Sequence, residues 1–427
     1  MIKCGAAELV CTPPFGIMIP GYFGGRIANG LKDELYVKAV VFDDGTEKIA
    51  LIAIDIIGVS FPMADRIRKA INEAVSIPEK NIMIAATHTH TGSATDMESY
   101  GCLPDENAVN IVCDKAADAA ALAYRRLNSV YIGYGVGAEY DIGFNRRFYL
   151  ADGTAVTNPG YDRTDLVGPA GPVDPSVNVV RIDNEANEPV AVLVNYACHL
   201  DVVGGSEFCA DYPGEMSKVI KKNLGNDVIC IFFNGCCGDI NHHDFTGAHK
   251  IEPQHYKKMG RILGADVLAV REKITVNGDD IKIGAVNEIM ELPRRQPSKA
   301  QYDAAKKLLE GTPGISERTY AEHHIELYEN PVLTRKIEVQ ALRIGELGIS
   351  AFPSETFVEV GLEIKEGSPF KYNFTVELAN GSCGYVCTAK ALKEGGYETM
   401  LSKYVNMGEE TAEIIAKTSI KLLNYLK

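Results

Sequence analysis

The sequence lacks the features that mark membrane-spanning, nucleic-acid-binding and disulfide-stabilised proteins. It contains no tryptophan, no apolar run long enough to span a bilayer, and no N-terminal apolar stretch of signal-peptide length. Its formal net charge of -14 repels nucleic acid and anionic membranes at long range. The 11 cysteines include no CxxC pair, and their odd number predicts buried thiols instead of disulfides. These absences predict a cytoplasmic protein that binds neither nucleic acid nor membrane.

The composition is that of a globular protein, and predicted strands alternate with predicted helices. Hydrophobic residues make up 46% and charged residues 23% of the sequence, which is an ordinary balance for a chain with a sizeable core. The apolar runs at 49–54, 81–86 and 228–233 have the length of buried strands. An Ala-rich helix is predicted over 107–127. This alternation predicts an α/β fold, in which a layered mixed β-sheet is flanked by helices.

One segment departs from the alternation. Residues 299–310 and 320–328 are charged and have a helical, amphipathic pattern. We therefore expect a single domain over 1–427, with a helical insertion or lid at 297–330. No internal repeat and no low-complexity linker indicates a second domain.

Several predicted strands end in a polar turn. His88, His199 and Glu355 each follow an apolar run within a few residues. Sites in open α/β sheets lie beyond the carboxyl ends of the strands. The sequence therefore predicts a site at the C-terminal ends of these strands.

The His88-Thr89-His90 triplet carries the strongest chemical signal. Residues i and i+2 of extended backbone point to the same side, so both imidazoles can face one cavity. Neutral imidazole is a favoured zinc ligand, and two histidines with a carboxylate leave room for water and substrate. His88, His199 and Glu355 therefore form a candidate zinc site. The alternative is a pair of core histidines at a sheet edge.

Together these motifs resemble those of a known family. The matching segments occur in the family's order, and they are Ala85–Gly92, Phe144-Asn145-Arg146, Tyr196–His199, Asn234–Asp239, Phe352–Glu355 and Gly384-Tyr385-Val386. The sequence is similar to the neutral/alkaline non-lysosomal ceramidases in their N-terminal catalytic domain. Members of that family are amidases that remove the fatty acyl chain from sphingoid amines.

The resemblance implies a complete zinc site. In that family the metal is held by the first histidine of the His-Thr-His block, a later histidine, a glutamate and a tyrosine. The corresponding ligands of Zn2+ in this sequence are His88, His199, Glu355 and Tyr385. An ordinary strand tyrosine is the alternative for Tyr385, because tyrosine is an uncommon zinc ligand.

Further site residues follow from the same resemblance, with one departure. By this correspondence His90 contacts the reacting carbonyl and Arg146 binds a substrate oxygen or carboxylate. Tyr397 matches a second site tyrosine of the family. Family ceramidases carry a serine soon after the Gly-Asp pair, but Asn241 stands there in this sequence. An amide cannot replace a hydroxyl as a nucleophile, so metal-bound water is the expected nucleophile.

The predicted substrate is smaller than ceramide. The sequence ends shortly after Leu401, so we expect the immunoglobulin-like C-terminal domain of the lipid enzymes to be absent. The lack of tryptophan leaves no recognisable membrane-docking surface. We therefore predict a zinc-dependent hydrolase of an amide or ester bond in a small soluble substrate, with a homo-oligomer left open. The alternatives are a metal-dependent lyase or isomerase, or a non-catalytic ligand-binding relative.

Other polar side chains are predicted to act around the zinc ligands. Asp55 or Asp239 is expected to fix a histidine tautomer from outside the zinc ligands. His242 and His243 either tune the substrate pocket or bind a second metal, and a solvated His-rich loop is the alternative.

Overall fold

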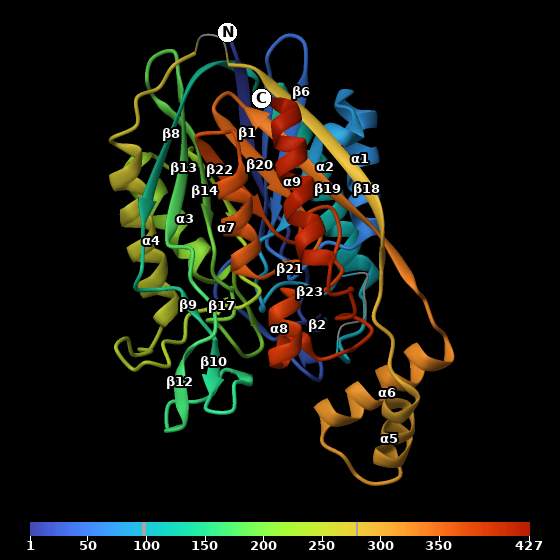
Figure 1. Cartoon of the computed structure of the whole chain (residues 1–427). Coiled ribbons are helices and arrows are strands. Elements are labelled where there is room, and N and C mark those ends of the chain that lie inside the picture. Colours follow the sequence, from blue (N-terminus) through green and yellow to red (C-terminus); the bar gives the residue numbers. More distant parts are fainter. Residues whose placement is uncertain (96–99, 279–280) are drawn as a thin grey trace.

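A computed structural model gives the fold, and it describes residues 1–95, 100–278 and 281–427. The largest element is an eight-stranded mixed sheet (Figure 1). In spatial order its strands are β16 (Ile229–Asn234), β14 (Pro189–Tyr196), β13 (Ser176–Asn184), β8 (Asn128–Ala138), β1 (Lys3–Val10), β5 (Tyr36–Asp43), β6 (Lys48–Ile54) and β7 (Ile82–Ala86). The pairs β14–β16 and β6–β7 are parallel, and the other neighbours are antiparallel.

A second, four-stranded sheet packs against one face of the first. Its strands are β18 (Ile283–Pro293), β19 (Thr334–Ile344), β20 (Leu347–Ala351) and β22 (Tyr372–Val376). Side chains such as Phe42 and Leu51 from the large sheet share one apolar cluster with Ile349 and Phe374 from the small one. The α/β class and the layered mixed sheet flanked by helices are as predicted, whereas the second sheet was not anticipated.

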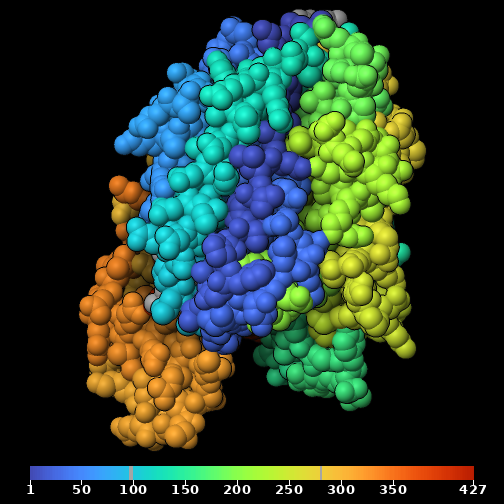
Figure 2. Space-filling model, turned by 180° about the vertical axis from the view of Figure 1, so that it is seen from behind, coloured from blue at the N-terminus to red at the C-terminus, as the bar shows by residue number. Residues whose placement is uncertain are grey.

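Helices cover the outer faces of both sheets. The large sheet is covered by α1 (Phe61–Val75), α2 (Glu106–Arg125), α3 (Asp211–Leu224) and α4 (His255–Arg271). The small sheet is covered by α7 (Val358–Gly367) and α9 (Thr411–Leu426). From behind, the N-terminal segment lies in the seam between α2 and the α3–α4 pair (Figure 2). The result is a four-layered arrangement of helices, sheet, sheet and helices.

The position of strand β5 between two layers explains why it is apolar on both faces. Val37, Ala39 and Val41 pack under α1 and α2, while Val40 and Phe42 face the second sheet. Successive side chains of a strand point to opposite faces, so a strand covered on both sides reads as a continuous apolar run.

The predicted helical insertion forms a hairpin of two helices between β18 and β19. These are α5 (Lys299–Leu309) and α6 (Ile315–Glu329), which project from one end of the molecule (Figure 1). Ser298 and Gln301 form a capping box at the start of α5. The second helix starts at Ile315 instead of Tyr320. A lid function for this hairpin stays a prediction.

Short elements complete the chain. The helical ones are α8 (Ala389–Glu394), η1 (Glu79–Asn81) and η2 (Tyr397–Thr399). The short strands are β2 (Met18–Ile19), β3 (Arg26–Ile27), β4 (Gly30–Leu31), β9 (Phe144–Asn145), β10 (Arg147–Leu150), β11 (Ala155–Thr157), β12 (Leu166–Pro169), β15 (Glu207–Phe208), β17 (Ile240–Asn241), β21 (Glu355–Thr356) and β23 (Tyr385–Val386). Across the described residues, every helix is too short or too polar to cross a membrane.

Candidate metal centre

Three buried histidines converge beyond the ends of β7 and β14. Within the described part of the chain, one group of three or more His, Cys, Asp or Glu side chains has its ligand atoms close enough together to hold a metal ion. This group consists of His88, His90 and His199. His88 has a φ of 79°, a strained left-handed conformation that is uncommon outside glycine. The turn is held by the His88 backbone amide, which donates to the Ile56 carbonyl at 3.0 Å. The strained turn aims the His88 ring at the other two rings.

Backbone carbonyls fix the tautomers of two of these histidines. Nδ1 of His88 lies 2.6 Å from the Ile57 oxygen, and Nδ1 of His199 lies 2.7 Å from the Cys237 oxygen. A carbonyl can only accept, so each Nδ1 carries a proton and each neutral ring keeps its lone pair on Nε2. Both Nε2 atoms therefore point inward as electron donors.

Glu355 and Tyr385 complete the set of four predicted ligands. The parallel pairing of β21 with β23 places Glu355 opposite Tyr385. Oε2 of Glu355 lies 3.4 Å from Nε2 of His88 and 3.5 Å from Nε2 of His199. The Tyr385 hydroxyl lies 3.4 Å from Nε2 of His199. The structure thus brings all four side chains to one place.

The charged groups at this centre fit a bound cation. Burial pushes the pKa of His88 down, but the Glu355 carboxylate outweighs it and raises that pKa above its ordinary value. Burial alone would raise the pKa of Glu355, yet His88 and His199 hold it well below the ordinary range. Burial, with Arg146 nearby, lowers the pKa of His199 to about 3. A carboxylate facing inward-pointing imidazole nitrogens fits a divalent cation, which would replace the proton on His88.

His90 lies beside the four predicted ligands. Its Nε2 is 3.4 Å from Nε2 of His88, and its Nδ1 is 3.1 Å from the Gly21 oxygen. Burial lowers the pKa of His90 well below its ordinary value, so the ring is neutral. A Cβ at Gly21 would lie 2.8 Å from Nδ1 of His90, at a φ of +114°. The need for glycine there could not be read from the sequence.

Arg146 lies behind Tyr385, and its hydrogen bonds go to protein groups. Its Nε donates to Glu398 at 2.7 Å, and its Nη2 donates to the Gly238 oxygen at 2.7 Å and to the Tyr385 hydroxyl at 3.1 Å. Glu398 is fully buried and also accepts from Thr157 Oγ1 at 2.6 Å. Reasoning from the sequence missed Glu398, which no local motif marks.

The remaining predicted residues, Tyr397 and Asn241, differ in their placement. Tyr397 lines the same cavity as the histidines, and its ring centre lies 5.9 Å from that of Tyr385. The side chain of Asn241 is buried and donates to Asn158 Oδ1 at 2.9 Å, while its own oxygen accepts from the His243 amide. Asn241 therefore contacts the surrounding loop instead of the four predicted ligands.

Two cavities meet at Tyr397. The first, of about 410 Å³, has His88, His90, Glu355 and Tyr385 in its wall. The second, of about 660 Å³, lies against the α5–α6 hairpin. Its walls are mainly apolar and aromatic, and include Phe23, Ala305, Leu308, Tyr320 and Met400. Tyr397 lines both, so an apolar groove continues outward from the metal-facing cavity.

Predictions about supporting carboxylates were wrong. Asp55 accepts from the Tyr36 amide and the Thr87 hydroxyl, and Asp239 accepts from Asn145 and the Val358 amide. Neither contacts a histidine ring, because backbone carbonyls already occupy both Nδ1 atoms.

The His-rich loop has separate contacts. The rings of His242 and His243 are 4.1 Å apart, and Nδ1 of His243 lies 3.0 Å from the Tyr161 hydroxyl. Neither residue belongs to a metal-capable group in the described ranges. The structure therefore gives no support for a second metal there.

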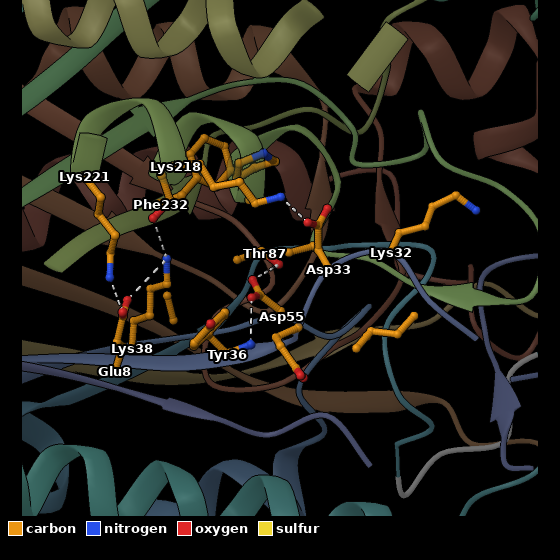
Figure 3. Close-up of a pocket in the computed structure, with 17 residues that line it drawn as sticks. Glu8, Lys32, Asp33, Tyr36, Lys38, Asp55, Thr87, Lys218, Lys221 and Phe232 are labelled. Atoms are coloured by element: carbon orange, nitrogen blue, oxygen red, sulfur yellow. Dashed lines mark hydrogen bonds and ion pairs between the residues drawn. The ribbon is translucent and has the colours of Figure 1, made fainter. Parts of the chain in front are cut away.

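A further cavity, of about 370 Å³, is lined by Asp55, Thr87 and several charged side chains (Figure 3). Asp55 and Thr87 hydrogen-bond to each other in its wall. Its charged side chains pair among themselves, with Lys221 on Glu8 and Lys218 on Asp33. The lining thus neutralises much of its own charge, and it shares no residue with the metal-facing cavity.

The fold is an α/β fold that is represented among solved structures by ceramidases. A neutral ceramidase from Pseudomonas aeruginosa matches with a TM-score of 0.76 at 15% identity, covering 100% of this chain and 74% of the other. A ceramidase complexed with C2 matches with a TM-score of 0.75 at 14% identity, covering 100% and 75%. At such identities the likeness establishes the fold.

The sequence itself gives a family similarity. A family model described as "Neutral/alkaline non-lysosomal ceramidase, N-terminal" matches residues 4–206. This part of the chain is thus similar to the N-terminal domain of the neutral/alkaline non-lysosomal ceramidases, as its motifs predicted. No curated protein matches the sequence significantly. The matched range includes His88, His90, Arg146 and His199, whereas Glu355 and Tyr385 lie beyond it.

Proposed function

We propose that the protein is a zinc-dependent hydrolase of an amide or ester bond. The observation that carries the proposal is the convergence of His88, His199, Glu355 and Tyr385 on one point. Three of them, His88, Glu355 and Tyr385, line the cavity. Imidazole and carboxylate are favoured zinc ligands, and a site of this kind leaves a position for water or substrate. Zinc bound there would supply Lewis-acid polarisation and lower the pKa of water toward neutrality.

His90 is placed to accept a proton in this cavity, although the burial that lowers its pKa weakens it as a base. The Gly21 carbonyl accepts from Nδ1, so the lone pair of the neutral ring is on Nε2, which faces the centre. A neutral imidazole at the reacting position is a common general base. Donation to the substrate carbonyl, which the family resemblance implies for His90, would require the other tautomer. The geometry therefore favours proton transfer from the attacking water to His90.

Arg146 acts through Tyr385 in this proposal. Its guanidinium donates to the phenol oxygen, and Glu398 holds the guanidinium from behind. The hydrogen bond fixes the phenol and places positive charge beside its oxygen. Arg146 is therefore a positioning residue for the fourth ligand.

The apolar groove beside Tyr397 favours a substrate with an apolar arm. The reacting bond would lie in the cavity that contains the histidines, and the arm would extend along the α5–α6 hairpin. The structural relatives are named ceramidases, which agrees with an amide bearing such an arm. Asn241, in place of the family serine, supports water as the nucleophile.

The proposal is tested by metal analysis together with hydrolysis. Purified wild type would be compared with His88→Ala and His199→Ala, and with His249→Ala as a control outside the group. We expect about one zinc per chain in the wild type and control, and loss of zinc and of hydrolysis of acyl amides and esters in the other two. Solvent oxygen in the acid product would separate hydrolysis from elimination. Hydrolysis that persists without bound metal would contradict the proposal.

A further inference from the structure

Glu377 is a fully buried carboxylate that lies behind the candidate metal centre. It follows β22, has an exposed fraction of 0%, and its backbone amide donates to the Asn234 oxygen at 3.2 Å. The resemblance assigns it no part, and no sequence motif singles it out. Its side chain contacts the turn that orients His199 and the strand that carries Glu355, which are two of the four proposed zinc ligands.

The first contact is with the turn that orients His199. Oε2 of Glu377 accepts from the Cys237 amide at 3.1 Å, and Oε1 accepts from the Cys237 thiol at 2.9 Å. The carbonyl of the same Cys237 receives Nδ1–H of His199 at 2.7 Å. Glu377 thus fixes the peptide group that sets the His199 ring orientation.

The second contact is with the strand that carries Glu355. Oε2 of Glu377 also accepts from the Thr356 amide at 3.0 Å, one residue beyond Glu355. The two turns themselves touch, because Gly238 donates to the Thr356 oxygen at 2.9 Å. A Cβ at Gly238 would lie 2.8 Å from the Glu355 oxygen. One carboxylate therefore joins the two turns where their backbones approach most closely.

We infer that Glu377 is a positioning residue that holds His199 and Glu355 in register for the metal, an inference that rests on the proposed zinc site. Three donors converge on it from two chain segments: two backbone amides and one thiol. A carboxylate meets them all as an acceptor without bringing a donor of its own. Residues that orient metal ligands from outside the first shell typically change metal affinity by about 10- to 100-fold when replaced.

The test compares Glu377→Gln and Glu377→Leu with a matched control. Glutamine keeps one oxygen for the two amides but faces the thiol with an NH2 group, whereas leucine leaves the donors without an acceptor. The control is Glu338→Gln. Glu338 is another buried carboxylate, and its Oε2 lies 2.7 Å from Nη1 of Arg68. It contacts none of the proposed ligands. For each protein, zinc affinity is measured by competition with a chromophoric chelator, and thermal unfolding is measured without metal.

We expect zinc affinity to fall at least tenfold in Glu377→Leu and by a smaller factor in Glu377→Gln. Glu338→Gln should lower the unfolding temperature while keeping wild-type zinc affinity. If the folded Glu377 variants bind zinc as the wild type does, Glu377 is only a structural residue and the inference is overturned. If the wild type itself binds no zinc, the proposed metal site is overturned. This outcome is distinct because it is measured on the wild type and not on the Glu377 variants.

Discussion

The Tyr385 hydroxyl lies 3.1 Å from Nη2 of Arg146, and the guanidinium is the donor. The phenol oxygen is thus held between a cation on one side and Nε2 of His199, 3.4 Å away, on the other. Burial and the Glu355 carboxylate raise the pKa of Tyr385 well above its ordinary value, while Arg146 acts to lower it. The arrangement suits a phenol that approaches a metal without solvent access.

Tyr385→Phe tests whether the phenol oxygen is a ligand. The variant keeps the ring and its packing but removes the oxygen, so we expect zinc affinity to fall by about tenfold or more. Hydrolysis at saturating zinc should also fall. Zinc affinity is measured by chelator competition. Tyr397→Phe serves as the control, because Tyr397 lines the cavity without contacting His199; equal zinc affinity in both variants would exclude Tyr385 from the ligand set.

Gly21→Ala tests the part of His90. Alanine at this φ of +114° would place a Cβ 2.8 Å from Nδ1 of His90. The control is Gly16→Ala, in the same N-terminal segment, with a φ of +97°. Apart from its chain neighbours, no atom of the described residues would lie within 4 Å of the added Cβ. Each variant should lose about 1–3 kcal/mol of unfolding free energy from backbone strain, as measured by urea denaturation.

Only Gly21→Ala should also reduce hydrolysis, because only there is the ring of His90, the proposed base, displaced. We expect at least a tenfold fall in kcat for Gly21→Ala, and a kcat near the wild-type value for Gly16→Ala. Equal activities in the two variants would mean that the His90–Gly21 contact does not matter for the reaction.

His242→Phe tests a predicted dependence of stability on pH. Burial lowers the pKa of His242 to about 3, and among the described residues its Nδ1 has no hydrogen-bond partner. The folded state therefore keeps this ring neutral between about pH 6.5 and 3, where the unfolded state binds a proton. Stability contributed by neutral His242 is fully present above pH 6.5 and is lost as the pH falls toward 3.

Phenylalanine cannot be protonated, so the variant escapes this loss. The unfolding free energy of His242→Phe is compared with that of the wild type at each pH. Between pH 7 and pH 5 this difference should change by about 1–2 kcal/mol in favour of the variant. Urea denaturation of metal-free protein at both pH values measures it. A stability difference that does not change with pH would show that His242 is protonated in the folded state.

The sequence predicted those parts of the centre that depend on local pattern. His88 and His90 follow β7, and His199 and Glu355 also follow apolar runs, so a meeting at one sheet edge was expected from general rules. The extended backbone expected for the His88-Thr89-His90 triplet was wrong, because His88 has a φ of 79°. The choice of Tyr385 needed the family resemblance, because a tyrosine in a short strand carries no local signal. The structure places these side chains together, and their binding of a metal stays a prediction.

Other features could not be predicted because they depend on contacts between distant segments. Gly21 and Glu377 act on residues 69 and 140 positions away in the chain. The second sheet was missed because its strands β18 and β19 are separated by the helical hairpin, and no pattern in either strand indicates its partner. Asp55 was wrongly expected to orient a histidine, since the sequence could not show that backbone carbonyls occupy the Nδ1 atoms.

The apolar groove predicts how activity depends on the length of the substrate. Leu308, on α5, lines the groove and has an exposed fraction of 41%. Leu308→Gln should lower kcat/KM for long-chain acyl esters by about fivefold, because each methylene buried contributes about 0.8 kcal/mol and the polar amide removes one or two such contacts. Short-chain esters should be hydrolysed as before, since the reacting bond is proposed to lie on the other side of Tyr397.

The control is Leu333→Gln, whose leucine is 64% exposed and lines none of the cavities described. A uniform loss over all chain lengths would place the apolar arm elsewhere, whereas a loss confined to long chains would assign the α5–α6 hairpin to substrate selection.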